Sequence, residues 1–296
     1  MQGMKIIVYG AGRLGQRAIS KIPRIYGCNI IAAADGAESL KDRKIMGISI
    51  IRPAEIKNLD FDMVLIAISR EDSIAQVKSD LQLMGIPDAK IEVLKRSGKF
   101  RAVWMDLRVD WIKNFAEYER ANGIKGNVAE CGVYRGDFSK YLNAFYYDRK
   151  LYLFDTFEGF DERDVQFEQS LMEKNFLNSK FNEKGHFNDT AIERVMDKMT
   201  YPENIVIRQG WFPQSADGIQ DTFCFVVLDM DLYQPMIAGL RFFWDKTEKG
   251  GAILCHDYFH HSLTGVKQAV IDFENEIGQR IIKAPIGDDC SIVLYK

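Results

Sequence analysis

Runs of apolar residues alternate with amphipathic stretches along most of the chain. In its first part, short apolar runs end on a glycine or a polar residue and predict strands, and the amphipathic stretches between them predict helices. The predicted strands are Lys5–Gly10, Asn29–Asp35, Met63–Ser69 and Lys90–Leu94, and the predicted helices run up to Tyr26 and over Asp72–Met84. Strands that alternate with helices form parallel sheets covered on both faces. The pattern therefore predicts an α/β unit.

A polar, glycine-containing stretch at Lys95–Phe100 interrupts this alternation. A helix-like segment over Val103–Asn122 follows it, and strand and helix patterns then start again. The chain has 296 residues, about twice the usual size of a domain. We therefore predict two Rossmann-like α/β domains, residues 1–97 and 98–296.

The second part contains five further strand patterns, each close to a glycine or an acid. They are Gly126–Gly136, Lys150–Phe160, Asn204–Gly210, Cys224–Asp231 and Gly250–Tyr258, and the segments RIIKAP and CSIVLYK close the chain. Residues 161–200 are polar and rich in aromatic side chains, without strand character. That length is unusual for a simple connection, so we expect a lid or an insertion there.

Composition excludes several classes of function. A net charge of −3 and a pI near 5.9 leave no electrostatic footprint for nucleic acid. The chain enters a strand pattern at once, as a signal peptide would not, and no apolar run reaches the length of a membrane span. Five scattered cysteines suit a reducing compartment. We expect a cytoplasmic homo-oligomer that acts on a small molecule and binds neither membranes nor nucleic acid.

Three strand ends of the second part carry a ligand signal. The turn Glu130–Gly136 has glycines where a backbone can approach a ligand closely, and Asp155 ends the next strand about twenty residues later, where an acid can bind a ribose. Trp211, after Gly210, offers a flat face for a purine. An acidic residue beside the glycines suits a ligand that joins adenosine to a positive sulfonium better than it suits a ligand with an anionic pyrophosphate. The alternative is an ordinary turn whose acids face solvent, and spacing alone indicates only an adenosine-like ligand.

Five ordered motifs also resemble a known family. GNVAECGVYRGDFS, YLFDTFEGF, QGWFPQS, VVLDMDLYQP and GGAILCHDY resemble the macrocin and mycinamicin type of sugar O-methyltransferases over roughly Asn122 to Lys296. The resemblance implies a class I methyltransferase fold with a mostly parallel sheet, S-adenosylmethionine as methyl donor and Mg²⁺ at the acceptor. The implied acceptor is a hydroxyl of a sugar, of a sugar-containing natural product or of a surface-polysaccharide precursor. The residues that the resemblance assigns to the donor are Glu130, Gly132, Tyr134, Gly136, Ser139, Asp155, Thr156, Gly210 and Trp211.

Acidic residues follow the last two parallel strands. Asp229 and Asp231 end one strand, and His256 and Asp257 end the next. Adjacent strand ends would converge these groups, and hard carboxylates suit Mg²⁺. A divalent cation acidifies and orients an acceptor hydroxyl, and a carboxylate takes its proton. The resemblance assigns metal binding to Asp229, His256 and Asp257, and the base role to Asp229.

Two alternatives stay open for this cluster. Many relatives have two acids where this chain has His256 and Asp257, so His256 is a metal ligand, a catalytic base or a support for a ligand. Asp229 and Asp231 would be a plain solvated strand end, and the chain a non-catalytic scaffold, if Asp229 and Asp257 pointed apart.

The first domain carries a dinucleotide-type fingerprint, GAGRLG followed by an acid. Its members are Gly10, Gly12, Arg13, Gly15 and Asp35. The fingerprint supports a competing function, an NAD-dependent oxidoreductase acting on a nucleotide-sugar. The domain also resembles small Rossmann-like modules of polysaccharide pathways, which leaves a ligand-binding role and an assembly role as alternatives.

Overall fold

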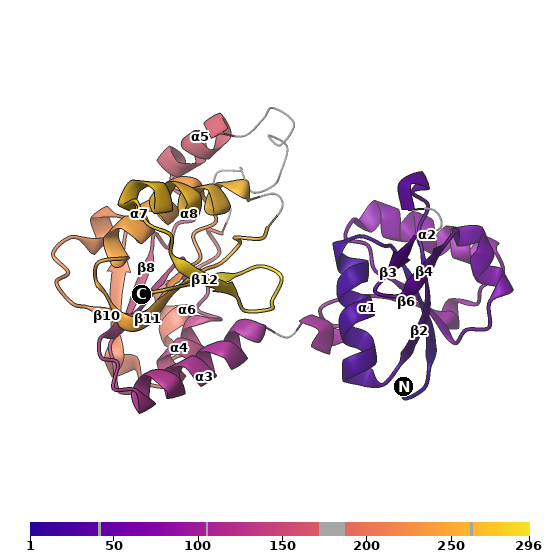
Figure 1. Cartoon of the computed structure of the whole chain (residues 1–296), viewed down its shortest axis with the longest axis horizontal. Helices are drawn as coiled ribbons and strands as arrows, with labels where there is room; N and C mark the ends of the chain where they lie inside the picture. Colours follow the sequence, from indigo (N-terminus) through magenta and orange to yellow (C-terminus); the bar gives the residue numbers. More distant parts are fainter. Residues whose placement is uncertain (41–42, 105, 172–186, 261–262) are drawn as a thin grey trace. The chain divides into compact units, whose positions relative to one another are not determined.

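The chain divides into two compact units, Met1–Met105 and Asp106–Lys296 (Figure 1). The computed structural model describes residues 1–40, 43–104, 106–171, 187–260 and 263–296. The division comes later than the boundary predicted after residue 97. Phe100 and Val103 are buried in the core of the first unit, and the ring of Phe100 contacts Tyr26 edge-on at a centroid distance of 5.2 Å. These apolar contacts hold the residues before Met105 to the first unit.

The first unit is a six-stranded sheet with the order β3-β4-β2-β1-β5-β6. Its elements are β1 (Lys5–Tyr9), α1 (Arg13–Tyr26), β2 (Asn29–Ala34), β3 (Lys44–Ile45), β4 (Ile48–Ile51), β5 (Met63–Ile66), α2 (Glu71–Leu83) and β6 (Ile91–Val93). All neighbouring strands are parallel except β3 and β4. Side chains alternate across β1: Ile6 and Val8 pack on the side of α1, whereas Ile7 packs with residues of α2. Both faces of the sheet are therefore covered, as predicted.

The second unit is a seven-stranded sheet with the order β12-β13-β11-β10-β7-β8-β9. Its strands are β7 (Asn127–Cys131), β8 (Leu151–Asp155), β9 (Ile205–Gln209), β10 (Phe223–Leu228), β11 (Thr247–Cys255), β12 (Ile282–Pro285) and β13 (Ile292–Tyr295). Its helices are α3 (Leu107–Ala121), α4 (Ser139–Phe145), α5 (Glu162–Leu171), α6 (Ile192–Met196), α7 (Tyr233–Phe243) and α8 (Thr264–Ile277). Among the described residues of this sheet, only the two pairs made by β13 are antiparallel. The predicted mostly parallel sheet is confirmed.

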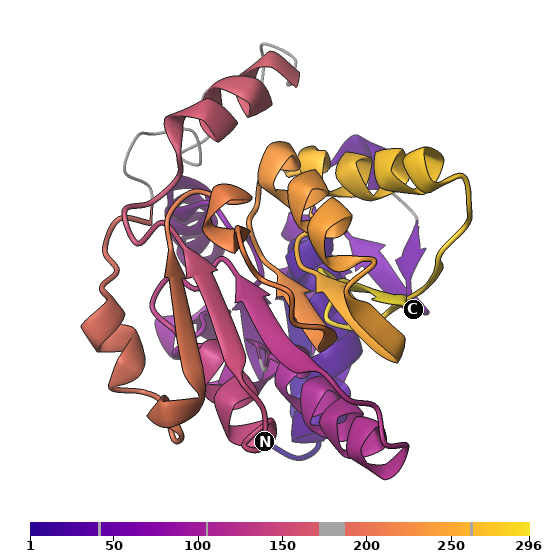
Figure 2. The same ribbon diagram turned by 90° about the vertical axis from the view of Figure 1, so that its left-hand side faces the viewer.

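Helices cover both faces of this second sheet (Figure 2), and an apolar core lies on each face. One core joins the sheet to α7 and α8, and the other joins it to α3 and α4. Helices α5 and α6 lie within the segment 161–200, for which we expected a lid or an insertion; its residues 172–186 lie outside the described residues. No helix of the described chain is both long and apolar enough to cross a membrane.

Strand order and register bring the predicted strand ends together. Strand β7 lies between β8 and β10, where the order of the sheet reverses, and ligands of open α/β sheets bind at such a point. Leu228 of β10 pairs with Cys131 of β7 and with Cys255 of β11. The residues that follow these three, Gly132, Asp229 and His256, therefore leave the sheet at the same level.

Candidate active site

The glycine turn after β7 is pressed against the end of β10. Gly132 has a φ of +87°, and a Cβ atom on it would lie 2.0 Å from the carbonyl oxygen of Asp229. A side chain at this position would clash with backbone, which is why the turn requires glycine. Tyr134 and Gly136 also have positive φ angles, +50° and +70°. The turn is thus held in one shape by backbone contacts.

Asp155, the predicted ribose ligand, ends β8 beside this turn. Its Oδ2 accepts hydrogen bonds from the backbone N–H groups of Val133 (2.7 Å) and Tyr134 (2.9 Å), and its Oδ1 accepts one from Phe157 (2.7 Å). A carboxylate offers about four acceptor positions, so at least one remains. Thr156, the next residue, closes the following turn by donating to the carbonyl oxygen of Gly159 at 2.6 Å. Asp155 shapes the turn, and its predicted contact with a ribose stays a prediction.

Glu130 lies beneath the turn rather than facing outward. The residue is 1% exposed, and its carboxyl group is hydrogen-bonded to the hydroxyl of Ser139 at the start of α4. Burial raises the pKa of Glu130 to about 8; the Asp229 carboxylate adds to this, and Ser139 and Arg108 oppose it. The sequence analysis expected this carboxylate beside a cationic ligand. Burial favours the uncharged form of this carboxyl group, and its contact with a cationic ligand stays a prediction.

Trp211, the predicted purine platform, already has partners on α5. Its indole N–H donates to Asp164 at 2.9 Å, and the guanidinium carbon of Arg163 lies 3.9 Å from the ring centroid. Gly210, with a φ of +127°, donates its N–H to the carbonyl oxygen of Asp155 at 2.9 Å. Because Arg163 covers one face of the indole, a purine would have to use the other face.

The acidic residues after β10 and β11 converge. Carboxylate oxygens of Asp229, Asp231 and Asp257 all lie within 4.8 Å of one another. Asp231 and Asp257 have φ angles of +59° and +57°, a conformation that costs about 1–3 kcal/mol for a residue other than glycine and that clusters at functional sites. Asp229 and Asp257 therefore do not point apart, as the scaffold alternative required.

His256 lies between the two strand ends. Its Nδ1 is 2.8 Å from Oδ1 of Asp229 and 2.8 Å from Oδ2 of Asp257. Burial opposes a charge on the ring, but these carboxylates raise the pKa of His256 well above its usual value. Burial likewise disfavours charge on Asp229, yet His256 and Arg108 hold the pKa of Asp229 below its usual range. The contact between His256 and Asp229 is an ion pair when the imidazole is protonated.

Arg108, in the first turn of α3, was missed by the sequence analysis. Its Nη1 is 2.9 Å from Oδ2 of Asp229, its Nη2 pairs with Asp106 at 2.9 Å, and its guanidinium lies 4.3 Å from the ring centroid of Phe138. These contacts orient the side chain of Asp229. The contact spans 121 residues of sequence, so no local pattern could indicate it.

The first unit places its fingerprint residues at a comparable turn. A Cβ atom on Gly10 would lie 2.8 Å from the carbonyl oxygen of Ala67, and one on Gly15 would lie 1.8 Å from that of Gly10. At Gly12, before the first residue of α1, Arg13, nothing lies within 4 Å of such an atom. The turn has the required glycines, and nucleotide binding there stays a prediction.

Comparison with known proteins assigns the second unit. Residues 102–295 match the profile of the macrocin-O-methyltransferase (TylF) family, and residues 2–92 match one described as C2185-like, N-terminal. An 8-demethyl-8-(2,3-dimethoxy-α-L-rhamnosyl)-tetracenomycin-C 4′-O-methyltransferase of Streptomyces olivaceus is 26% identical over 217 residues, 69% of this chain and 78% of that protein.

Among solved structures, the O-methyltransferase NovP is similar, with a TM-score of 0.55 and 19% identity over 64% of this chain and 79% of NovP. This likeness confirms the predicted methyltransferase fold. The family match covers most of the second unit, including all five motifs noted in the sequence. The chain therefore belongs to the macrocin-O-methyltransferase family and is an S-adenosylmethionine-dependent O-methyltransferase.

Proposed function

We propose that this enzyme methylates a hydroxyl of a sugar and that Mg²⁺ at Asp229, His256 and Asp257 assists the transfer. The observation that carries the proposal is the convergence of three carboxylates within 4.8 Å beside the glycine turn. The relative from S. olivaceus is named for a rhamnosyl acceptor, which supports a sugar hydroxyl as the acceptor here.

The chemistry of these residues fits a hard cation. Buried carboxylates that share one small space repel one another unless they are paired or bound to a metal. Arg108 and His256 pair with Asp229, and His256 also contacts Asp257, so two side chains face three carboxyl groups that lie within 4.8 Å. Oxygen donors with space for water are what Mg²⁺ prefers. When bound, the cation would lower the pKa of the acceptor hydroxyl and fix its position.

The residues of the chain would divide the remaining work. Asp229, held by Arg108, takes the proton of the acceptor hydroxyl. The turn at Gly132 and the carboxylate of Asp155 hold the adenosine part of the donor, so that its methyl group faces that hydroxyl. His256 is either a ligand of the cation or a second base, and the imidazole position allows both.

The decisive experiment measures S-adenosylhomocysteine formation over a panel of deoxysugar-containing acceptors, after EDTA treatment and after return of Mg²⁺. We expect activity to disappear and then to recover, while S-adenosylhomocysteine binding by calorimetry stays unchanged. His256→Asp should keep substantial activity if His256 is a ligand, and should lose it, most steeply at low pH, if the imidazole is the base. Full activity in EDTA, together with an active Asp229→Asn variant, would exclude the metal and leave His256 as the base.

The fingerprint of the first unit supports a second, separate proposal: a nucleotide or nucleotide-sugar site. Its support is the glycine turn at Gly10 and the open position at Gly12, where a phosphate can approach backbone N–H groups. Calorimetry of the full chain with NAD⁺ and UDP-sugars tests it. Heat of binding that Gly12→Val abolishes would support the site, and no binding of any nucleotide would leave an assembly role.

A further inference from the structure

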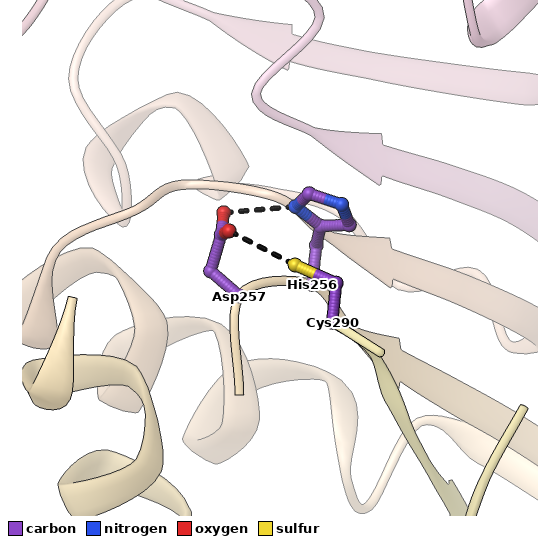
Figure 3. A group of neighbouring side chains, drawn as sticks. All are labelled: His256, Asp257 and Cys290. Atoms are coloured by element: carbon purple, nitrogen blue, oxygen red, sulfur yellow. Dashed lines mark hydrogen bonds and ion pairs between the residues drawn. The ribbon is translucent and has the colours of Figure 1, made fainter. Parts of the chain in front are cut away.

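A cysteine stands beside the metal-binding residues proposed above. Figure 3 shows the carboxylate of Asp257 between the imidazole of His256 and the thiol of Cys290. Oδ2 of Asp257 is 2.8 Å from Nδ1 of His256, and its Oδ1 is 3.2 Å from Sγ of Cys290. One nitrogen, one oxygen and one sulfur donor thus lie within 4.8 Å of one another.

The position of the thiol is fixed by backbone contacts. The N–H of Phe259, two residues after Asp257, donates to the carbonyl oxygen of Cys290 at 2.9 Å. The N–H of Cys290 donates to Oδ1 of Asp288 at 3.0 Å, and β13 begins two residues later with Ile292 opposite Cys255. The pairing of β11 with β13 therefore keeps Cys290 next to His256 and Asp257, so the three donors need no large rearrangement to meet one ion.

These donors select a different cation from the carboxylates of Asp229, Asp231 and Asp257. Mixed nitrogen, oxygen and thiolate ligands suit Zn²⁺ and related transition metals, whereas Mg²⁺ takes oxygen ligands and water. The other four cysteines, Cys28, Cys131, Cys224 and Cys255, are buried, and none of them belongs to such a group within the described residues. Among the described cysteines, Cys290 is the one that adds a sulfur donor beside His256 and Asp257.

We propose that His256, Asp257 and Cys290 form a Zn²⁺ site that shares His256 and Asp257 with the residues proposed for Mg²⁺, so that Zn²⁺ and Mg²⁺ exclude each other. The thiol binds as a thiolate and the imidazole binds in its neutral form, and the proton that each of them loses passes to solvent. Three protein ligands leave a fourth, tetrahedral position for water. The competition with Mg²⁺ rests on the proposed function, whereas the Zn²⁺ site itself does not.

Co²⁺ reports directly on a cysteine ligand, because a thiolate bound to it gives a charge-transfer absorption in the near ultraviolet. Titration of the metal-free full chain with Co²⁺ should produce this absorption, and Zn²⁺ should displace it. Cys290→Ser should abolish the absorption and weaken Zn²⁺ binding at least tenfold, on the order of what supporting groups of a metal site alone contribute. Cys28→Ser, a matched change of a buried cysteine in the first unit, should alter neither. An unchanged absorption in Cys290→Ser, or none in the native chain, would overturn the site.

An activity measurement separates this inference from the proposed function. Zn²⁺ should inhibit Mg²⁺-supported methyl transfer, and Cys290→Ser, which removes no residue proposed for Mg²⁺ or the donor, should relieve the inhibition. Mg²⁺-dependent activity without a thiolate absorption refutes the Zn²⁺ site alone. A thiolate absorption in an enzyme that needs no metal refutes the Mg²⁺ proposal and leaves the Zn²⁺ site standing.

Discussion

The two units of this chain contain glycine turns with the same hydrogen-bonding scheme but different surroundings. In the first unit, Gly10 follows the central strand and donates its N–H to the carbonyl oxygen of Ala34 on the neighbouring strand, at 2.8 Å. Asp35, the next residue of that neighbour, accepts the N–H of Ala11 at 2.8 Å. The acid after the second strand thereby holds the turn after the first strand.

The second unit repeats this arrangement. Gly132 donates its N–H to the carbonyl oxygen of Phe154 at 2.9 Å, and Asp155 accepts the N–H of Val133 at 2.7 Å. Both acids use their carboxylates on the backbone of the turn. In both units, the acid about twenty residues after the glycine turn therefore stabilises the backbone of that turn.

The difference lies on the other neighbouring strand. Ala67 donates its N–H to the end of β1 at 2.8 Å, and Asp229 donates its N–H to the end of β7 at 2.9 Å, so the two residues hold equivalent positions. Val8 and Glu130, each two residues before the first glycine, are also equivalent. The buried polar and charged side chains of the described residues all belong to the second unit. In both units the glycine turn provides a scaffold, and the residues beside it determine the chemistry.

Methyl transfer should respond most strongly when Asp229 of the second unit is replaced by alanine, the residue that the first unit has at the equivalent position, Ala67. Asp229→Ala removes the proposed base and metal ligand, so methyl transfer should fall by about a thousandfold. Arg108 keeps its pairing with Asp106, so folding and S-adenosylhomocysteine affinity should be retained. The measurement is turnover at saturating donor, with Asp245→Ala, whose side chain is 93% exposed, as the control. Activity within tenfold of the native enzyme would mean that methyl transfer does not need the carboxylate of Asp229.

Alanine at a turn glycine tests how tightly each scaffold is packed. Gly132→Ala forces a Cβ atom to 2.0 Å from a carbonyl oxygen at a positive φ and should lower the free energy of unfolding by about 3 kcal/mol. Gly12→Ala in the first unit meets no atom within 4 Å and should cost about 1 kcal/mol or less. Urea denaturation of both variants gives the two values. Equal losses would show that Gly132 is no more constrained by its surroundings than Gly12.

Buried carboxyl groups should make the stability of the second unit depend on pH. Glu119 of α3 is 0% exposed, and its Oε2 accepts a hydrogen bond from the hydroxyl of Tyr146 at 2.7 Å. Burial raises the pKa of Glu119 from 4.5 to about 7. The folded state therefore binds more protons than the unfolded chain between these values, and stability should fall as pH rises through them, by up to about 3 kcal/mol for this group.

Glu119→Gln should remove that part of the pH dependence and leave stability below pH 4.5 nearly unchanged. Urea denaturation of the native chain and the variant at pH 4.5 and pH 8 measures it. The prediction is wrong if both proteins lose the same free energy of unfolding between the two pH values.

The smallest effect should come from changing the two acids that stabilise the turns, Asp155 and Asp35. Asp155→Ala should weaken S-adenosylhomocysteine binding ten- to a hundredfold, since hydrogen bonds to a charged group are worth roughly 1.5–3 kcal/mol each. Asp35→Ala, the equivalent change in the first unit, should leave this affinity unchanged. Asp155→Asn keeps an oxygen acceptor for the turn, so its affinity for S-adenosylhomocysteine should lie between the affinities of the two alanine variants. Calorimetry that finds no difference between Asp155→Ala and Asp35→Ala would confine Asp155 to its structural role.

The strand ends of both units could be predicted because apolar runs stop abruptly at glycine or aspartate. Gly132, Asp155 and Asp229 lie at the ends of strands, where the pattern predicted them, and the parallel sheet follows from the alternation. The short pair β3 and β4 gave no such signal, since strands of two and four residues are too short to show a clear periodicity. The division after Met105 lies later than the predicted boundary, and the sequence does not show that Phe100 packs in the core of the first unit.

Contacts between distant segments account for what was missed at the site. Arg108 reaches Asp229 from a helix at the start of the second unit, and Arg163 covers the indole of Trp211 from α5. Cys290 stood out only as one of five scattered cysteines. Each of these depends on how strands and helices pack in space, which hydrophobic periodicity does not specify.

The close approach of Gly132 to the carbonyl oxygen of Asp229 has a consequence for how acceptor choice can diverge in this family. The turn proposed for the methyl donor and the strand end proposed for the acceptor meet through main-chain atoms, so their separation does not depend on the identity of any neighbouring side chain. Substitutions in the surrounding loops can then alter which sugar fits without changing the path of the methyl group. A lineage that explores new acceptors would inherit this spacing intact and would lose it only through a change at residue 132 itself.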